Sequence, residues 1–148
     1  MSDQLVQKRR DGHVIRVDSK TSDRMRGIRQ KDTKPEIVVR KLLHELGHRY
    51  RVRNRDLPGS PDVANRSRRW AVFVHGCYWH RHGCKATTTP KRNRAFWEAK
   101  FARNVERDAE SAAALRKLGF TVVVVWECET KGDLAALRER LHSELNQA

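Results

Sequence analysis

The segment from Val74 to Cys84 carries chemically active side chains at an unusual density. Within eleven residues it holds three histidines, two cysteines, a tyrosine and a tryptophan, directly after an apolar run. Histidines and cysteines are metal ligands, and histidine also transfers protons near neutral pH. A segment that only fills a core has no use for them, so this one predicts a site built on a metal ion.

Two cysteines and a histidine of this segment, Cys77, His82 and Cys84, lie within eight residues. Cys128, much later in the chain, would complete a set of three cysteines and one histidine, which structural zinc prefers. Such a metal would hold the shape of an irregular loop that has few apolar residues to bury. His80 is the alternative for the histidine position, and buried free thiols beside surface histidines are the plainer interpretation. Spacing alone does not decide between them.

Asp62 is a second candidate for metal binding, because it follows Pro61 at the start of a predicted strand. The next predicted strand runs back past it and ends near Val74. Magnesium prefers oxygen ligands, which the Asp62 carboxylate and the Val74 backbone carbonyl would supply beside a scissile phosphate. An aspartate at the start of a hairpin strand, beside the end of the partner strand, is an arrangement found in nucleases. Many such nucleases also carry a second carboxylate and a lysine on the partner strand, where this chain has Val74, His75 and Gly76. A histidine would then take over proton transfer.

Each of these residues also has a plain structural interpretation. Asp62 caps a turn after a proline, Glu36 closes a capping box at a helix start, and Asp108 is solvated on an exposed helix face. A single His75 or His80 is also more often structural. Their combination is what favours a catalytic centre.

Hydrophobic spacing predicts the elements that must position these residues. Helices are expected over 21–29, from Thr33 to Leu46 with a capping box of Thr33 and Glu36, over 94–118, and over 134–145. Strands are expected over 50–52, 62–64, 70–74 and 120–126, the last buried on both faces, while 75–90 is irregular. Strand, long helix and strand from 70 to 126 predict a right-handed βαβ unit beside an antiparallel hairpin. The expected fold class is α/β, a small mixed β-sheet flanked by helices.

The net charge of +14 over 148 residues attracts polyanions, of which nucleic acid is the commonest, although a solvated basic surface is the alternative. We find no apolar run of roughly 18 residues and no hydrophobic segment after the charged N-terminus, so we expect an intracellular protein without a membrane partner. The odd count of three cysteines favours metal ligation over disulfides. Residues 1–20 are predicted to be a flexible basic arm, in which Val14, Ile15 and Val17 can pair as a strand. A single domain is expected over 21–148.

Five motifs follow one another in a specific order. They are Leu57-Pro58-Gly59-Ser60-Pro61-Asp62, Phe73-Val74-His75-Gly76-Cys77-Tyr78-Trp79-His80, Phe96-Trp97, Asn104-Val105-Glu106-Arg107-Asp108 and Val125-Trp126-Glu127-Cys128. In these motifs, and in their approximate spacing from about Met25 to Cys128, the chain resembles the very short patch repair (Vsr) endonucleases.

The resemblance implies a restriction-endonuclease-like core and a bacterial, cytoplasmic, nucleoid-associated enzyme that depends on magnesium and acts as a monomer. Such an enzyme nicks one strand of double-stranded DNA 5′ of the thymine at a thymine–guanine mismatch, with mismatch-repair proteins as accessory partners. The resemblance assigns Asp62 and the Val74 carbonyl to magnesium, His80 to the general base, Asp108 to orienting His80, and His75 and Glu36 to the phosphate and water network. It assigns structural zinc to Cys77, His82, Cys84 and Cys128, and DNA contacts to Tyr78, Trp79, Trp97, Asn104 and Met25.

The chain departs from the family pattern at several positions. Val74 stands where well-known members have threonine and Tyr78 where they have phenylalanine, while Arg81 and Gly83 thin a histidine-rich run. A backbone carbonyl still binds metal at Val74, but the flanking sequence preference does not transfer. Two alternatives stay open: a nicking endonuclease of a restriction or defence system with a different DNA trigger, and a non-catalytic zinc-stabilised DNA-binding module.

Overall fold

The computed structural model describes residues 4–8, 14–18, 32–85 and 87–146. The expected helix over 21–29 and Met25 lie outside these residues. Near the N-terminus, β1 (Gln4–Lys8) pairs antiparallel with β2 (Val14–Asp18), in agreement with the expected pairing of residues 14–17. No helix within the described ranges has the length and apolar character needed to cross a membrane.

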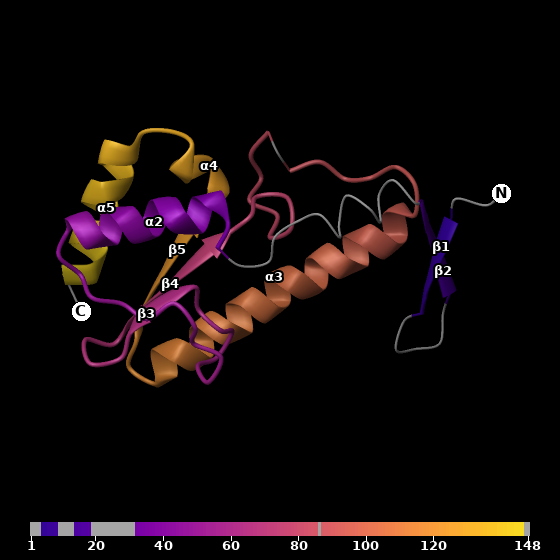
Figure 1. Cartoon of the computed structure of the whole chain (residues 1–148). Coiled ribbons are helices and arrows are strands. Elements are labelled where there is room, and N and C mark those ends of the chain that lie inside the picture. Colours follow the sequence, from indigo (N-terminus) through magenta and orange to yellow (C-terminus); the bar gives the residue numbers. More distant parts are fainter. Residues whose placement is uncertain (1–3, 9–13, 19–31, 86, 147–148) are drawn as a thin grey trace.

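The core of the fold is a three-stranded mixed sheet. Its strands are β3 (Val63–Asn65), β4 (Trp70–His75) and β5 (Thr121–Trp126), in the order β3-β4-β5. β3 and β4 form the expected antiparallel hairpin, and β4 and β5 run parallel. The connection between the parallel strands contains α3 (Arg94–Lys117), so the predicted strand–helix–strand unit is confirmed (Figure 1).

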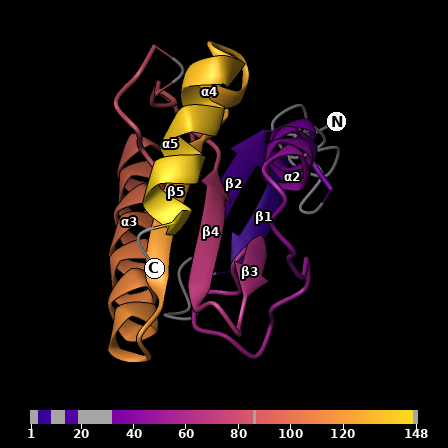
Figure 2. The same ribbon diagram turned by 90° about the vertical axis from the view of Figure 1, so that its left-hand side faces the viewer.

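Helices cover both faces of this sheet (Figures 1 and 2). On one face, α2 (Lys34–Glu45) and α5 (Leu134–Asn146) bury their leucines against Val72, Val123 and Val125. On the other face, Leu115 of α3 packs with Ala71 and Phe73. The alternate residues of β5, Val122 and Val124, also lie against this second cluster. The strand is therefore covered on both sides, as its unbroken apolar run predicts.

The start of α2 differs from the predicted capping box in one of its two hydrogen bonds. The Thr33 hydroxyl accepts the N–H of Glu36 at 3.5 Å, as expected. The Glu36 carboxylate, however, accepts the N–H of Asp32 at 2.9 Å rather than that of Thr33. Asp32 has a left-handed backbone with φ 55°, and this turns the chain one residue earlier than a regular capping box requires.

Three other details of the fold were not foreseen. The expected strand over 50–52 is reduced to a single bridge between Arg51 and Ala64. The predicted apolar stripe of the last helix begins at Leu134, but that side chain is 41% exposed and the buried stripe begins at Leu137. A short helix, α4 (Glu127–Thr130), follows β5 directly.

The loop before Asp62 depends on a glycine, which gives a test of the fold. Gly59 has φ +73°, and a Cβ there would lie 2.5 Å from Cβ of Ser111 on α3. Gly47, after α2, has a similar φ of +79° but nothing within 4 Å of its Cβ position. We expect Gly47→Ala to lower the free energy of unfolding by about 1 kcal/mol for backbone strain alone. Gly59→Ala should add about 1–3 kcal/mol of overpacking.

Urea unfolding of both variants measures the difference between these two effects. Equal losses would contradict the close contact between the loop and α3.

Candidate active site and metal clusters

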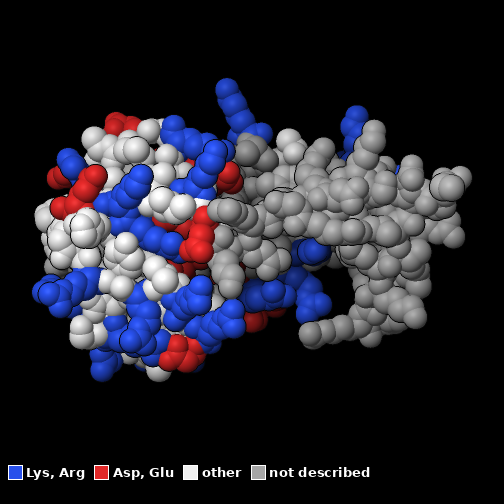
Figure 3. Space-filling view, viewed as in Figure 1, with Lys and Arg blue, Asp and Glu red and all other residues white. Residues whose placement is uncertain are grey.

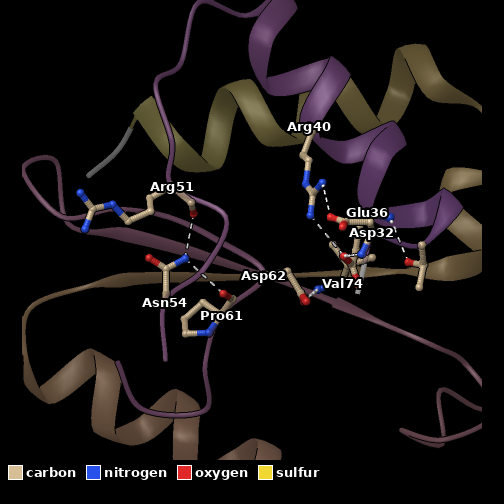
Figure 4. Close-up of polar contacts among 9 residues, drawn as sticks. Asp32, Glu36, Arg40, Arg51, Asn54, Pro61, Asp62 and Val74 are labelled. Atoms are coloured by element: carbon tan, nitrogen blue, oxygen red, sulfur yellow. Dashed lines mark hydrogen bonds and ion pairs between the residues drawn. The ribbon is translucent and has the colours of Figure 1, made fainter. Parts of the chain in front are cut away.

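Asp62 lies at the end of the sheet where β4 finishes. Because β3 and β4 are antiparallel, the residue that precedes β3 comes opposite the last residues of β4. The Val74 N–H donates to the Asp62 Oδ2 at 2.7 Å (Figure 4). Burial raises the pKa of Asp62 to about 6, against the opposing effect of this hydrogen bond, and the nearby Glu36 carboxylate raises it further. The carboxyl thus sits where its negative charge is destabilised unless a cation joins it.

Glu36 is held beside Asp62 by contacts that sequence reasoning missed. The carboxylate is buried, with 7% of the residue exposed, and Arg40 Nη2 lies 3.4 Å from its Oε2. The other guanidinium nitrogen of Arg40 binds Asp32 Oδ1 at 2.8 Å. The position of Arg40 four residues after Glu36 on a predicted helix was the available signal, because such residues share a face.

A histidine and carboxylate group forms the other side of the site. His80 Nδ1 lies 2.5 Å from Asp108 Oδ2, and His75 Nε2 lies 4.0 Å from the other oxygen of that carboxylate. The two imidazole rings stack with centroids 4.0 Å apart. Burial, with His80 as a second cause, lowers the pKa of His75 to about 4, so this ring is neutral near pH 7. A carboxylate at Nδ1 favours a hydrogen on that nitrogen, which leaves Nε2 of His80 to accept a proton.

These groups line one cleft of about 520 Å³. Its walls include the predicted residues Glu36, Asp62, Val74, His75, Tyr78, Trp79, His80 and Asp108. The structure therefore brings the expected catalytic set together from α2, the β3–β4 hairpin, the following loop and α3. Arg107, Ser111 and Glu127 also line the cleft and were not predicted. Glu127 could have been found from its position, because it directly follows a predicted buried strand and directly precedes Cys128.

The predicted zinc ligands form a separate group. One ligand atom from each of Cys77, His82, Cys84 and Cys128 lies within 4.8 Å of the others, and Cys128 Sγ is 3.4 Å from His82 Nδ1. His80 belongs to the other group, with His75 and Asp108. Burial raises the pKa of Cys77 to about 11, so a metal is needed to hold that sulfur as a thiolate. Three sulfurs and an imidazole within this distance fit a soft, tetrahedral metal.

Aromatic residues join the cleft to the start of α3. Tyr78 and Trp79 are partly exposed, and the Trp79 ring lies 6.2 Å from that of Trp97. Trp97 is only 3% exposed and packs beneath Trp79, which matches core packing. Asn104 donates to the Trp79 carbonyl at 3.2 Å, so it holds the loop in this arrangement.

A basic α/β chain whose strand ends gather a buried carboxylate and a histidine–carboxylate pair has the features of a DNA endonuclease. The family model of the DNA mismatch endonuclease Vsr matches residues 15–86. The chain is 47% identical over 122 residues to the type II nicking enzyme V.XorIIP of Xanthomonas oryzae pv. oryzae, which covers 82% of this chain and 89% of that protein. The chain belongs to the Vsr family and is an endonuclease that acts on phosphodiester bonds of DNA.

Two further relatives support this membership. The type II nicking enzyme V.NmeAIP of Neisseria meningitidis is 45% identical over 124 residues, or 84% of this chain and 88% of that protein. The DNA mismatch endonuclease Vsr of Escherichia coli is 39% identical over 123 residues, or 83% of this chain and 76% of that protein. Both similarities extend over most of this chain.

The raised pKa of Asp62 predicts how stability depends on pH in the absence of metal. A carboxyl with a raised folded-state pKa contributes stability below pH 4, and this contribution is lost as the pH rises through about 6. From a reference of 3.8 to about 6, the loss approaches about 3 kcal/mol. Asp62→Asn should therefore gain stability relative to the parent, by up to this amount, as the pH rises from 4 to 7.5 in magnesium-free buffer. The difference between the two proteins is the measured quantity, because the lowered pKa of His75 makes the stability of both rise with pH over the same range.

Asp56→Asn is the matched control, because Asp56 is exposed and Arg66 lowers its pKa to about 2. The stability that this pair contributes disappears only below pH 4, so the difference in stability between this control and the parent should stay constant from pH 4 to 7.5. Denaturant unfolding across this range decides the matter. A difference between Asp62→Asn and the parent that does not change with pH would show that Asp62 is not strained.

Proposed function

We propose that this protein is a magnesium-dependent endonuclease that nicks one strand of duplex DNA 5′ of the thymine at a thymine–guanine mismatch, which starts very short patch repair. Family membership supports this proposal, and the E. coli relative carries the name of a mismatch endonuclease. The observation that carries it is the shared cleft, in which Asp62 and His80 lie with the aromatic residues Tyr78 and Trp79.

Hydrolysis requires a cation at the phosphate and a base at the attacking water. Asp62 and the carbonyl of Val74 would hold magnesium, since both offer oxygen and the strain on the buried carboxylate favours a cation. Magnesium would supply positive charge at the scissile phosphodiester. His80, oriented by Asp108, takes the proton from water, while neutral His75 and Glu36 support the phosphate and water network. The products are a 5′-phosphate and a 3′-hydroxyl.

Mismatch recognition would use the aromatic group beside this centre. Unstacking costs less at a mismatch than in a matched duplex, and an aromatic ring that replaces a base stack contributes about 1–3 kcal/mol. We assign the wedge to Tyr78 and Trp79, with Trp97 packed behind them. Asn104 positions Trp79, and Met25 is assigned to DNA by the family pattern alone.

Structural zinc at Cys77, His82, Cys84 and Cys128 would stiffen the loop that carries the wedge. A loop that must unstack DNA loses its effect if it bends instead, and residues 76–93 contain no regular helix or strand among those described. We further propose a restriction-endonuclease-like core, a monomeric enzyme in the bacterial cytoplasm at the nucleoid, and one domain over 21–148 after an N-terminal arm.

A second function is favoured by the names of two relatives. The proteins from Xanthomonas oryzae and Neisseria meningitidis are named type II nicking enzymes. This chain would then serve a restriction–modification system. The DNA sequence around the nick would be the recognition site of the methyltransferase of that system. The chemistry would be the same, and only the DNA context would differ.

The test is a nicking assay with matched, mismatched and methylated duplexes of several sequence contexts. We expect nicking only with magnesium, only in the thymine strand of the thymine–guanine duplex, and on its 5′ side. Asp62→Ala should reduce nicking to background, and His80→Ala should reduce it by about 10²–10⁴-fold. Equal nicking of matched duplexes would reject mismatch dependence, and activity restricted to one methylated or palindromic context would favour the second function.

Zinc content distinguishes the two neighbouring histidines. We expect His82→Ala to lose bound zinc and to lower the melting temperature by at least about 5 °C, because metal binding contributes to folding. His80→Ala is the matched control: its imidazole pairs with Asp108, so zinc should stay at one ion per chain. Elemental analysis of both purified variants gives the answer. Zinc retained in His82→Ala but lost in His80→Ala would reverse the assignment.

A further inference from the structure

The connection between α2 and β3 carries an arginine at every second position: Arg49, Arg51, Arg53 and Arg55, which together we call the arginine track. All four are exposed. Between them, Tyr50 packs against the core and Asn54 is 1% exposed. Alternation of this kind is expected of extended chain, in which successive side chains point to opposite sides. Val52, where the chain bends, interrupts this alternation and is 39% exposed, so the segment is anchored at Tyr50 and Asn54 while its four arginines stay exposed.

The backbone of the arginine track is tied to the active centre. Arg51 exchanges two backbone hydrogen bonds with Ala64, of 2.8 and 3.1 Å. The Asn54 side chain donates to the carbonyl of Arg51 at 2.8 Å and to that of Pro61 at 3.2 Å (Figure 4). Pro61 directly precedes Asp62, so the position of the arginine track relative to the catalytic carboxylate is set by short contacts.

Two clefts follow the arginine track outward from the active centre. The nearer, of about 500 Å³, is lined by Arg40, Arg53 and Arg55 and shares Glu36, Ser60 and Asp62 with the catalytic cleft. The farther, of about 650 Å³, is lined by Arg49, Arg51, Arg66 and Arg68, with no carboxylate among its lining residues. Figure 3 shows lysines and arginines gathered over the part of this face that carries the α2–β3 connection. Arginines therefore line both clefts, mixed with the carboxylates Asp32, Glu36 and Asp62 in the nearer one and without a carboxylate in the farther one.

The charge of the arginine track is little compensated. Among the ion pairs of the described chain, none joins these four arginines to a carboxylate, and the neighbouring Asp56 is bound by Arg66. The helix α3, by contrast, mixes its basic residues with Glu98, Glu106, Asp108 and Glu110. Arginine is suited to phosphate because its planar group donates two parallel hydrogen bonds.

We propose that the arginine track binds the phosphodiester backbone of the duplex on one side of the nick, beyond the reach of the aromatic wedge. This rests on the proposed function in one respect, namely that duplex DNA enters the Asp62 cleft. A DNA strand whose scissile phosphodiester lies in that cleft would continue past Glu36, Ser60 and Asp62, which the two clefts share, and would reach the arginine track. If the partner of the arginine track were an acidic protein, the track would not need to adjoin the catalytic cleft.

The first test compares two triple variants that each remove three positive charges. One is Arg49→Gln, Arg51→Gln and Arg53→Gln. The control is Lys41→Gln, Lys117→Gln and Arg138→Gln, whose residues are exposed and line none of the three clefts. DNA affinity is measured in magnesium-free buffer without a chelator, against salt concentration, with matched and mismatched duplexes. Each lost phosphate contact should reduce the magnitude of the slope of log affinity against log salt by about 0.9. The slope of the track variant should therefore be smaller in magnitude than that of the parent by roughly 2–3.

The second test trims the duplex from either side of the nick. Trimming the flank that lies on the arginine track should weaken binding of the parent but hardly change the track variant, whereas trimming the other flank should weaken both equally. Slopes that fall equally in both triple variants, or trimming effects that do not depend on the variant, would overturn the proposal. Binding is measured without magnesium, so it does not depend on catalysis. If the parent bound matched and mismatched duplexes equally while the differences between the track variant and the control remained, the proposed mismatch specificity would be rejected and the arginine-track proposal would stand.

Discussion

The mixed pairing of β4 is the constraint on which the site depends. β3 runs antiparallel to β4, so the residue before β3 comes to the end where β4 finishes; β5 runs parallel to β4, so the residues after β5 reach the same end. Asp62 and His75 of the hairpin and Cys128, much later in the sequence, are thereby gathered at one end of the sheet. The hydrogen bond from the Val74 N–H to Asp62 closes this end of the sheet, because it uses a backbone donor that lies beyond the last pair of the hairpin ladder.

The loop after β4 separates two kinds of chemistry. His80 and His82 are two residues apart, yet the first joins His75 and Asp108 while the second joins the three cysteines. Arg81 between them has a left-handed backbone with φ 56°, and its guanidinium lies 4.2 Å from the Phe101 ring centroid and donates to the Thr88 carbonyl at 2.8 Å. These contacts hold the loop so that the three cysteines and His82 lie on one side and the His80 ring, the proposed general base, lies on the other.

Local patterns predicted the hairpin, the long helix and the buried strand, because each depends on short-range spacing and on burial that the sequence states directly. They also predicted that the candidate metal ligands would gather in groups, as they do in the structure, although spacing left the choice between His80 and His82 open. What they missed depends on distant contacts. The left-handed Asp32 redirects the Glu36 carboxylate, the strand over 50–52 shrinks to one bridge where the chain bends at Val52, and Trp97 is covered by Trp79. Trp97 is buried because tertiary packing places α3 against the loop that carries Trp79.

The distribution of charge follows from the same geometry. A chain of net charge +14 attracts DNA at long range, but a surface that is basic everywhere would also repel the magnesium ion that we propose for hydrolysis. Here the acidic residues Glu36, Asp62, Asp108 and Glu127 converge in one cleft, and arginines line its outward continuation. Arg40 balances Glu36 and Asp32, so the carboxylates stay together before any cation arrives. The raised pKa of Asp62 shows that this balance is incomplete. In the function that we propose, a bound cation would relieve this remaining strain and would hold the phosphodiester beside His80.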